Sequence, residues 1–134
     1  MISHLHHINF IVHDLDQAVE RYQHALGLGD FIYGTLNKRG VITARIKIGE
    51  TWLVLVQPTD SNSKPAKYLE KHGEGFFLLS FGTDNINDIL NKLEQTSSKP
   101  PIEKRQGLEN WQVVDFPEDL FFGAHFQLTE ESTN

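Results

Sequence analysis

Histidine is the residue type with the most chemistry to offer in this 134-residue chain, which contains seven histidines and no cysteine. Histidine titrates near neutral pH and is the commonest metal ligand, so the excess points to a metal site or an acid–base site. The absence of cysteine excludes disulfides, thiolate nucleophiles and cysteine-ligated zinc or iron–sulfur sites. Two histidines stand out by position: His7 lies near the start, and His125 lies two residues before Gln127 near the end.

Other common mechanisms lack their signatures in this sequence. No Gly-x-Ser-x-Gly motif occurs, and Gly27-Leu28-Gly29 precedes a predicted strand, whereas a phosphate-binding loop precedes a helix. A paired-carboxylate site needs two inward acids, and the strand pattern offers Asp115 alone. His7 is therefore the best candidate for a general acid or base.

Composition and charge place the chain among globular proteins. Hydrophobic residues make up 39% and charged residues 22%, which suits one folded domain. The formal net charge of −6 argues against a nucleic-acid partner, because neutralising phosphates needs clustered Lys and Arg. No apolar run approaches the roughly 20 residues that span a bilayer, and the N-terminus lacks the pattern of a signal peptide. We therefore expect a cytoplasmic protein without a membrane partner.

The elements that must position these histidines occur twice along the chain. A strand of about eight residues, 5–12, leads into a cap at Asp14 and an amphipathic helix; residues 76–83 lead into Asp84-Asn85 and a second helix. Superimposing Leu15 on Ile86 gives an offset of 71 residues, about half the chain. The apolar stripes of the two helices comprise Leu15, Ala18, Val19, Tyr22 and Leu26, and Ile86, Ile89, Leu90 and Leu93.

Three strand-like stretches follow each helix, so each half reads β-α-β-β-β and the fold class is α+β. The predicted modules are residues 1–57 and 74–128, joined by a linker at 58–73 with a short helix at 65–71 and followed by a polar tail at 129–134. The predicted strands after the helices are 29–36, 41–48 and 51–57 in the first half, and 101–106, 110–116 and 121–128 in the second.

The order and spacing of three segments on this doubled unit resemble the vicinal oxygen chelate superfamily, the glyoxalase, bleomycin resistance and dioxygenase fold. The segments are the opening at 7–16, the linker at 64–75, which looks most like the methylmalonyl-CoA epimerase branch, and the ending at 123–128. The resemblance covers nearly the whole chain. It implies a single domain, 1–134, with two tandem modules forming curved mixed sheets around a cleft. It also implies a homodimer.

In that superfamily four inward side chains, on the first and last strands of each half, hold a divalent metal that acts as a Lewis acid. Carried over by position, these are His7, Val54, Leu78 and Gln127, which makes the ligand positions degenerate. Val54 and Leu78 cannot ligate a metal, and tight divalent sites use three or four protein donors. A shift by one residue meets only apolar side chains at 53, 55, 77 and 79. The sequence therefore predicts neither a metal nor another cofactor.

We predict a protein that binds a small, partly apolar molecule in the inter-module cleft, in the manner of bleomycin resistance proteins. The expected ligand-binding residues combine polar contacts with an apolar wall: His7, Trp52, Val54, Leu78, His125 and Gln127.

Two alternatives stay open. The first is a metal-dependent lyase or epimerase of the glyoxalase I or methylmalonyl-CoA epimerase type, with Ni, Co, Zn or Fe held through His7, His125 and Gln127. The second is a purely structural or regulatory module. The remaining histidines, His4 and His6 included, are expected at the surface, and the orientation of Trp111 stays undecided.

Overall fold

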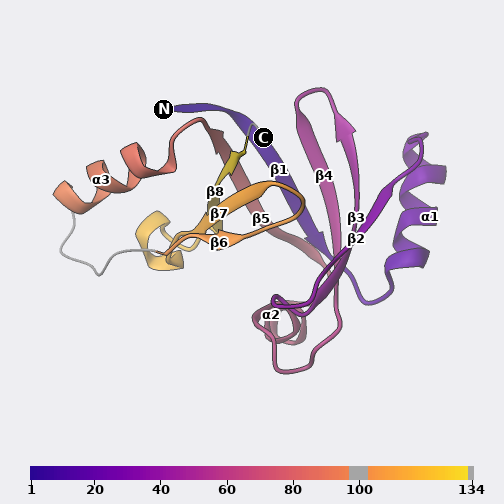
Figure 1. Cartoon of the computed structure of the whole chain (residues 1–134). Coiled ribbons are helices and arrows are strands. Elements are labelled where there is room, and N and C mark those ends of the chain that lie inside the picture. Colours follow the sequence, from indigo (N-terminus) through magenta and orange to yellow (C-terminus); the bar gives the residue numbers. More distant parts are fainter. Residues whose placement is uncertain (97–102, 133–134) are drawn as a thin grey trace. The chain divides into compact units, whose positions relative to one another are not determined.

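The computed structural model describes residues 1–96 and 103–132. Its first half contains β1 (Ile2–Ile11), α1 (Leu15–Leu26), β2 (Ile32–Leu36), β3 (Val41–Ile48) and β4 (Thr51–Pro58), and α2 (Lys64–His72) follows (Figure 1). The second half contains β5 (Gly75–Thr83), α3 (Ile86–Thr96), β6 (Arg105–Gln106), β7 (Trp111–Asp115), the 3-10 helix η1 (Glu118–Phe121) and β8 (Phe126–Glu131). The α+β class and the doubled β-α-β-β-β order are thus confirmed.

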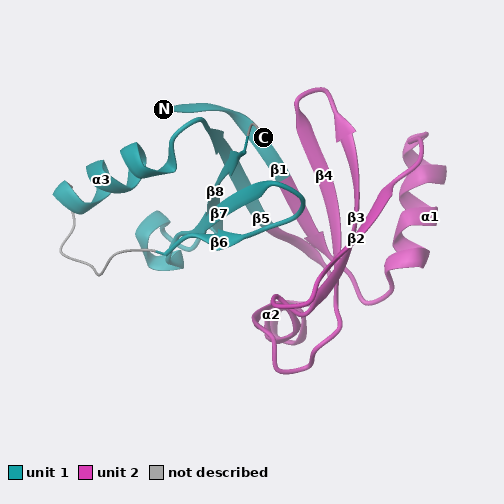
Figure 2. Cartoon of the chain, in the orientation of Figure 1, with its two compact units in different colours: residues 1–7, 78–134 teal, residues 8–77 magenta. Residues whose placement is uncertain are grey.

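The chain forms two compact units, coloured separately in Figure 2. Unit 1 comprises residues 1–7 and 78–134, and unit 2 comprises residues 8–77. The division falls inside β1 and β5, because the first part of β1 joins elements of the second half. These units therefore do not coincide with the two sequence modules.

Unit 2 has the strand order β2-β3-β4-β1, and β3 runs antiparallel to both β2 and β4. Helix α1 covers one face of these strands. Asp14 caps the helix by accepting a hydrogen bond from Gln17 N at 3.0 Å, and Gly27 ends it in the left-handed conformation at φ 64°. The core beneath α1 consists of Val12, Leu15, Val19, Phe31, Ala44 and Leu55.

Unit 1 has the order β1-β5-β8-β7-β6, with β8 parallel to β5 and antiparallel to β7. Helix α3 packs through Ile86 against Val114 and Leu128, and Asn85 Oδ1 accepts from Asp88 N at 3.2 Å at its start. Leu15 and Ile86 are 1% and 0% exposed. This common burial agrees with the 71-residue alignment of the two helices.

Two sequence predictions about the second half are wrong. The expected strand 121–128 begins only at Phe126, because Pro117 precedes a 3-10 turn and Phe122 and Gly123 both have positive φ, which interrupts extended backbone. The same strand runs on to Glu131, so Thr129, predicted in the polar tail, is buried. Residues 101–102 of the predicted strand 101–106 lie outside the described residues.

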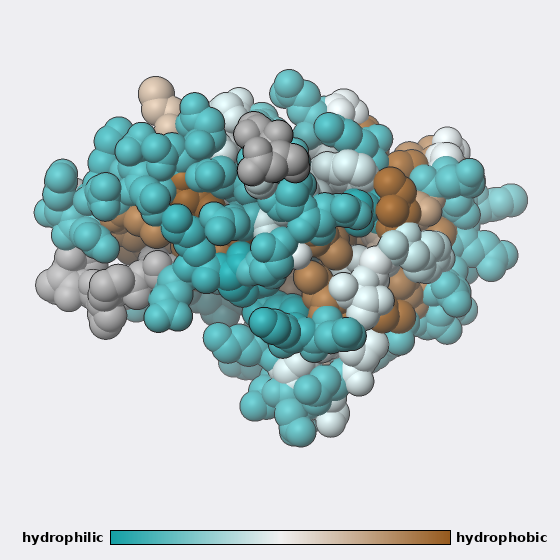
Figure 3. Space-filling model, viewed as in Figure 1, coloured by the Kyte–Doolittle hydropathy of each residue, from teal (hydrophilic) through white to brown (hydrophobic). Residues whose placement is uncertain are grey.

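Hydrophilic residues cover most of the face visible in Figure 3, and hydrophobic residues show between them on each unit. Phe122, in unit 1, is fully exposed, and Ile32, Tyr33, Ile48 and Phe76 are exposed in unit 2. Among the helices of the described ranges, none is both long and apolar enough to cross a membrane.

Candidate functional site

His7 lies buried on the sheet of unit 1 against the indole of Trp111. The His7 and Trp111 rings stack at 4.9 Å between centroids and 16° between planes. His6 meets the same indole edge-on at 4.6 Å and 87°. His6 is 2% exposed, so its predicted surface position is wrong, and strict alternation along β1 does not account for two consecutive buried histidines. Trp111 provides the apolar support for both rings.

A chain of polar contacts fixes Gln127. Arg105 donates from Nε to Asp115 Oδ2 at 2.6 Å and from Nη2 to Oδ1 at 3.2 Å. Asp115 lies directly opposite Gln127 in the β7–β8 register, and its Oδ1 accepts from Gln127 Nε2 at 2.9 Å. Because an ionised carboxylate only accepts, the amide nitrogen must face Asp115. Gln127 Oε1 is then a buried acceptor without a hydrogen bond of normal geometry in the described part of the chain, although the Gln127 side chain interacts with His7 and raises its pKa.

His7 is linked to a second carboxylate, that of Glu131, through His6. His6 Nε2 lies 2.6 Å from Glu131 Oε1, and His6 Nδ1 lies 2.9 Å from His7 Nδ1. Since Glu131 accepts, His6 Nε2 carries a proton. The contact between the two Nδ1 atoms then contains one proton. Either a positively charged His6 donates it to His7, or a neutral His7 donates it to His6. In both arrangements His7 itself is neutral.

The surroundings of His7 favour this neutral form strongly. The pKa of His7 is lowered from 6.5 to about 3, mainly by burial; the neighbouring His6 and Arg105 also lower it, whereas Gln127 and Asp115 act in the opposite sense. His7 is therefore an uncharged imidazole at neutral pH. It can donate or accept one hydrogen bond at Nε2, according to the proton arrangement on Nδ1.

The donor set falls short of the metal site that the resemblance implies. His7 and Gln127 come together in unit 1 as two neutral donors. Leu78, at the third position, is buried and apolar, and Val54, at the fourth, packs with Val41 and Val56 in unit 2. No group of three or more His, Asp or Glu side chains suited to a metal ion occurs within residues 1–96 and 103–132. The residues present do not fit a tight divalent ion.

Trp52 and Val54 lie on the face of unit 2 that α1 leaves uncovered, since their neighbours Leu53 and Leu55 belong to the α1 core. Arg45 is directly opposite Val54 in the β3–β4 register, and its Cζ lies 5.1 Å from the Trp52 ring centroid. Trp52 is half-buried. The face thus combines an apolar wall with a buried guanidinium.

His125 does not lie on β8 as predicted, because the strand begins one residue later. Its Nε2 pairs with Glu118 Oε1 of the 3-10 helix, and its carbonyl oxygen accepts from Leu79 N at 3.1 Å. The predicted partnership with Gln127 rested on both residues sharing one strand face. In the structure His125 instead contacts η1 through its side chain and β5 through its backbone.

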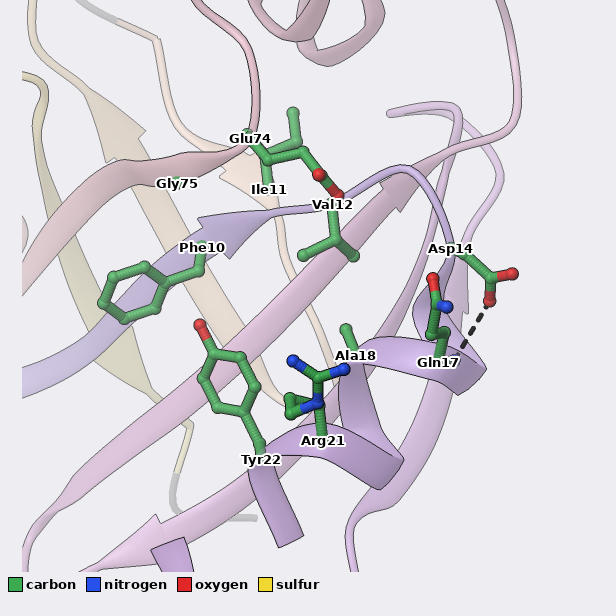
Figure 4. Close-up of a pocket in the computed structure, with 10 residues that line it drawn as sticks. All are labelled: Phe10, Ile11, Val12, Asp14, Gln17, Ala18, Arg21, Tyr22, Glu74 and Gly75. Atoms are coloured by element: carbon green, nitrogen blue, oxygen red, sulfur yellow. Dashed lines mark hydrogen bonds between the residues drawn. The ribbon is translucent and has the colours of Figure 1, made fainter. Parts of the chain in front are cut away.

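A groove of about 380 Å³ occurs elsewhere in unit 2, between the end of β1, helix α1 and the start of β5 (Figure 4). Phe10, Tyr22 and Arg21 are among its lining, and none of the six predicted ligand-binding residues is. Both acidic side chains in its lining accept hydrogen bonds from backbone N–H groups: Asp14 caps α1, and Glu74 Oε2 accepts from His13 N at 2.9 Å. Burial and the neighbouring Glu74 raise the pKa of Tyr22. The groove lies on the α1 side and is separate from the Trp52 face.

Sequence reasoning missed Arg45 and the supports of His7 and Gln127. A signal for Arg45 exists: Thr43, Arg45 and Lys47 alternate along β3 with residues of the α1 core. Long cationic side chains usually extend to solvent, which hides such a signal. The Arg105–Asp115 pair carries no sequence signal, because its partners are ten residues apart on neighbouring strands.

Comparison with known proteins agrees with this fold. The sequence profile of the Glyoxalase/Bleomycin resistance protein/Dioxygenase superfamily matches residues 6–114. An uncharacterised protein of Bacillus subtilis, YqjC, is 27% identical over 92 residues, which cover 69% of this chain and 66% of that protein, just under two thirds of its length.

Solved structures of methylmalonyl-CoA epimerases are similar along almost the full chain. One in complex with methylmalonyl-CoA and NH4+, and one from Streptomyces coelicolor in complex with 2-nitronate-propionyl-CoA, are each 25% identical. Each has a TM-score of 0.91, covering 99% of this chain and 97% of theirs. The Mycobacterium tuberculosis epimerase is 22% identical with a TM-score of 0.88, covering 98% of this chain and 89% of its own, which supports the fold alone.

Proposed function

The chain belongs to the glyoxalase/bleomycin resistance protein/dioxygenase superfamily, and we propose that within it this protein binds a small, partly apolar molecule without a divalent metal. The observation that carries the proposal is the pair Val54 and Leu78, two buried apolar side chains at positions where the resemblance expects metal ligands. Apolar walls with few polar groups are typical of sites that hold organic molecules.

On unit 1, His7 and Gln127 offer polar contacts to a ligand. Gln127 offers a carbonyl oxygen whose direction is fixed by Asp115, and His7 offers a neutral ring nitrogen. Groups held in place lose little conformational freedom when a ligand binds, which favours affinity and selectivity. On unit 2, taken by itself, Trp52 offers a flat surface to which an apolar or aromatic group can bind.

Metal analysis tests the metal-free part of this proposal. Purified protein is examined for bound metals and then titrated with nickel, cobalt and zinc while the melting temperature is followed. We expect less than one-tenth equivalent of metal and no ion-specific increase in Tm. Stoichiometric metal that is lost in His7→Ala would overturn this part.

Ligand binding is tested with a chemically diverse small-molecule library, using the indole Nε1–H signals of Trp52 and Trp111 in two-dimensional NMR. Trp52→Phe assigns the two signals. We expect compounds with an apolar ring and one or two polar groups to shift the Trp52 signal. Failure of every compound to shift either indole at millimolar concentration would contradict a binding role.

An enzyme of the epimerase type is the second candidate, favoured by the 25% identity to epimerases over nearly the full chain. In this function His7 would act as an acid or base, and an unconventional metal site through His7, His125 and Gln127 would assist. The pairing of His125 with Glu118 argues against that metal site. Incubation with methylmalonyl-CoA in D2O, with and without cobalt, discriminates: exchange of the C2 proton that His7→Ala abolishes would establish the enzyme.

A homodimer is part of the same proposal, and sedimentation velocity over a range of protein concentrations tests it. Fully exposed Phe122 on unit 1 supports it, because large exposed aromatic side chains are enriched where proteins associate. A single species at the monomer mass of 15.3 kDa would contradict the dimer.

A further inference from the structure

Two cationic side chains lie on the face of unit 2 that α1 does not cover. In the β3–β4 register Arg45 lies directly opposite Val54, and Lys47 lies directly opposite Trp52. Residues directly opposite each other in an antiparallel pair project from the same face of the sheet. Ala44 and Leu55, which project from the other face, belong to the α1 core. All four side chains therefore share the face that α1 does not cover.

The Trp52 indole makes cation–π contacts with both Arg45 and Lys47. Arg45 Cζ lies 5.1 Å and Lys47 Nζ 5.6 Å from the centroid of the Trp52 ring. Lys47 is exposed, Trp52 is half-buried, and Arg45 is only 5% exposed, so positive charge continues from the surface into the protein. Such an arrangement attracts an anion to the exposed Lys47 and places a largely desolvated cation, Arg45, next to it.

Two polar atoms on the same face are buried without hydrogen-bond partners among the residues that the structure describes: Asn9 Oδ1 and Thr43 Oγ1. Asn9 projects from this face because its neighbour Phe10 packs against the α1 core. Thr43 shares the parity of Arg45 along β3. Since buried polar atoms are normally satisfied, these two positions call for hydrogen-bonding groups that the described residues do not supply.

We infer that this face binds the carboxylate of a small organic acid, with Arg45 as its charged partner. This inference rests on the proposed binding function and gives the chemical class of the ligand. The planar guanidinium matches a carboxylate through two parallel hydrogen bonds, and Lys47 adds a second positive charge. Trp52 and Val54 pack against the apolar body of the acid. Asn9 and Thr43 receive a hydroxyl or amide group that it carries.

The position of Arg45 has a further chemical meaning. Val54 occupies a position that the resemblance assigns to a metal ligand, and Arg45 stands directly opposite it. The positive charge of Arg45 thus lies beside a position that lacks its metal-coordinating residue. Arg45 can stabilise the oxygens of a bound acid without a metal ion.

A matched pair of probes tests the role of charge: phenylacetate and its neutral isostere phenylacetamide, with inorganic phosphate as a third probe. Dissociation constants come from shifts of the Trp52 indole signal. We expect the acid to bind at least tenfold more tightly than the amide. Phosphate alone should compete only weakly, because it lacks an apolar body. Equal affinities for acid and amide, or phosphate binding as tight as that of the acid, would overturn the inference.

Three variants test the residue. Arg45→Met keeps the length of the side chain and removes its charge, and we expect at least a tenfold loss of affinity for the acid and little change for the amide. Arg45→Lys keeps the charge and removes the planar fork; it covers the case in which Arg45→Met fails to fold, with a loss of threefold or more. Lys38→Met, in the β2–β3 turn, changes the net charge equally and should bind as the natural protein does.

The failure of this inference is distinguishable from that of the proposed function. If a neutral library compound shifts Trp52 whereas neither phenylacetate nor other carboxylates do, the binding function stands and the carboxylate site is excluded. Full affinity for the acid in both Arg45 variants also excludes it.

Discussion

The Nδ1 atoms of His6 and His7 lie 2.9 Å apart, so two adjacent residues of one strand share a single proton between their rings. Glu131, whose side chain is 49% exposed, accepts a hydrogen bond from the Nε2–H of His6. The pair therefore connects a partly solvated carboxylate to a buried neutral imidazole. His7 owes its neutrality to this environment, and the environment can be measured through stability.

Stability should fall in acid because of His7. Its pKa is 6.5 in the unfolded chain and about 3 in the folded one, so the unfolded state binds more protons between these values. The free energy of unfolding then decreases as the pH falls from 6.5 towards 3, by up to about 1.4 kcal/mol per pH unit. Well above pH 6.5, where both states are unprotonated, His7 contributes no slope. Urea unfolding at pH 7, 6 and 5 should give a shallower pH dependence for His7→Phe than for the natural protein. Parallel curves would refute the assigned burial.

Removing the charge of Asp115 should cost modest stability. Arg105 and Asp115 are 31% and 38% exposed, so solvent screens their attraction, and we expect Asp115→Asn to lose about 1 kcal/mol. A double-mutant cycle with Arg105→Met should give a coupling energy of roughly 0.5–1 kcal/mol. Urea unfolding measures all four proteins. The same change frees the Gln127 amide to rotate, and additive single effects would contradict the described pair.

The end of α1 offers a comparison of two glycines. Gly27 has φ 64° and Gly29 has no positive φ, and a Cβ at either position would meet nothing within 4 Å. Gly27→Ala should therefore lose about 1 kcal/mol through backbone strain alone. Gly29→Ala should change the free energy of unfolding by less than about 0.5 kcal/mol. Thermal unfolding of both variants checks the difference, which an equal loss would contradict.

Phe122 occupies the left-handed region at φ 58° and ψ 41° with its side chain fully exposed. Phe122→Asn should raise or preserve the melting temperature, because asparagine tolerates this conformation better. Phe121→Asn is the contrasting variant: its ring packs on Phe116 at 5.1 Å and Phe126 at 5.3 Å, and about 1–3 kcal/mol should be lost. If Phe122→Asn also shifts sedimentation towards the monomer, Phe122 is part of the subunit contact.

The sequence predicted the fold well where local signals and burial agree. Asp14 and Asn85 cap the helices that they were expected to cap, and β3 begins and ends at the predicted residues 41 and 48. The prediction failed at the start of β8: the segment 121–128 resembles a strand, but positive φ at Phe122 and Gly123 interrupts it before Phe126. Apolar periodicity does not reveal such a backbone turn.

The candidate site was harder to predict than the fold. His7 and Gln127 lie in one network, as their strand positions indicated, whereas His125 turns to Glu118. Trp111, His6 and Arg45 were missed because their burial depends on cross-strand partners distant in sequence. Pairing across strands is a property of register, which a single sequence specifies only where turns are tight.

Strand β1 supplies residues 2–7 to unit 1 and residues 8–11 to unit 2 without interruption. A fragment cut between the repeated halves would therefore carry away six strand residues that belong to the other half. We therefore expect that neither half folds independently, even though the sequence repeats. Gene fragments ending at the linker should express as unfolded or aggregated chains, and the whole protein should unfold in one cooperative transition.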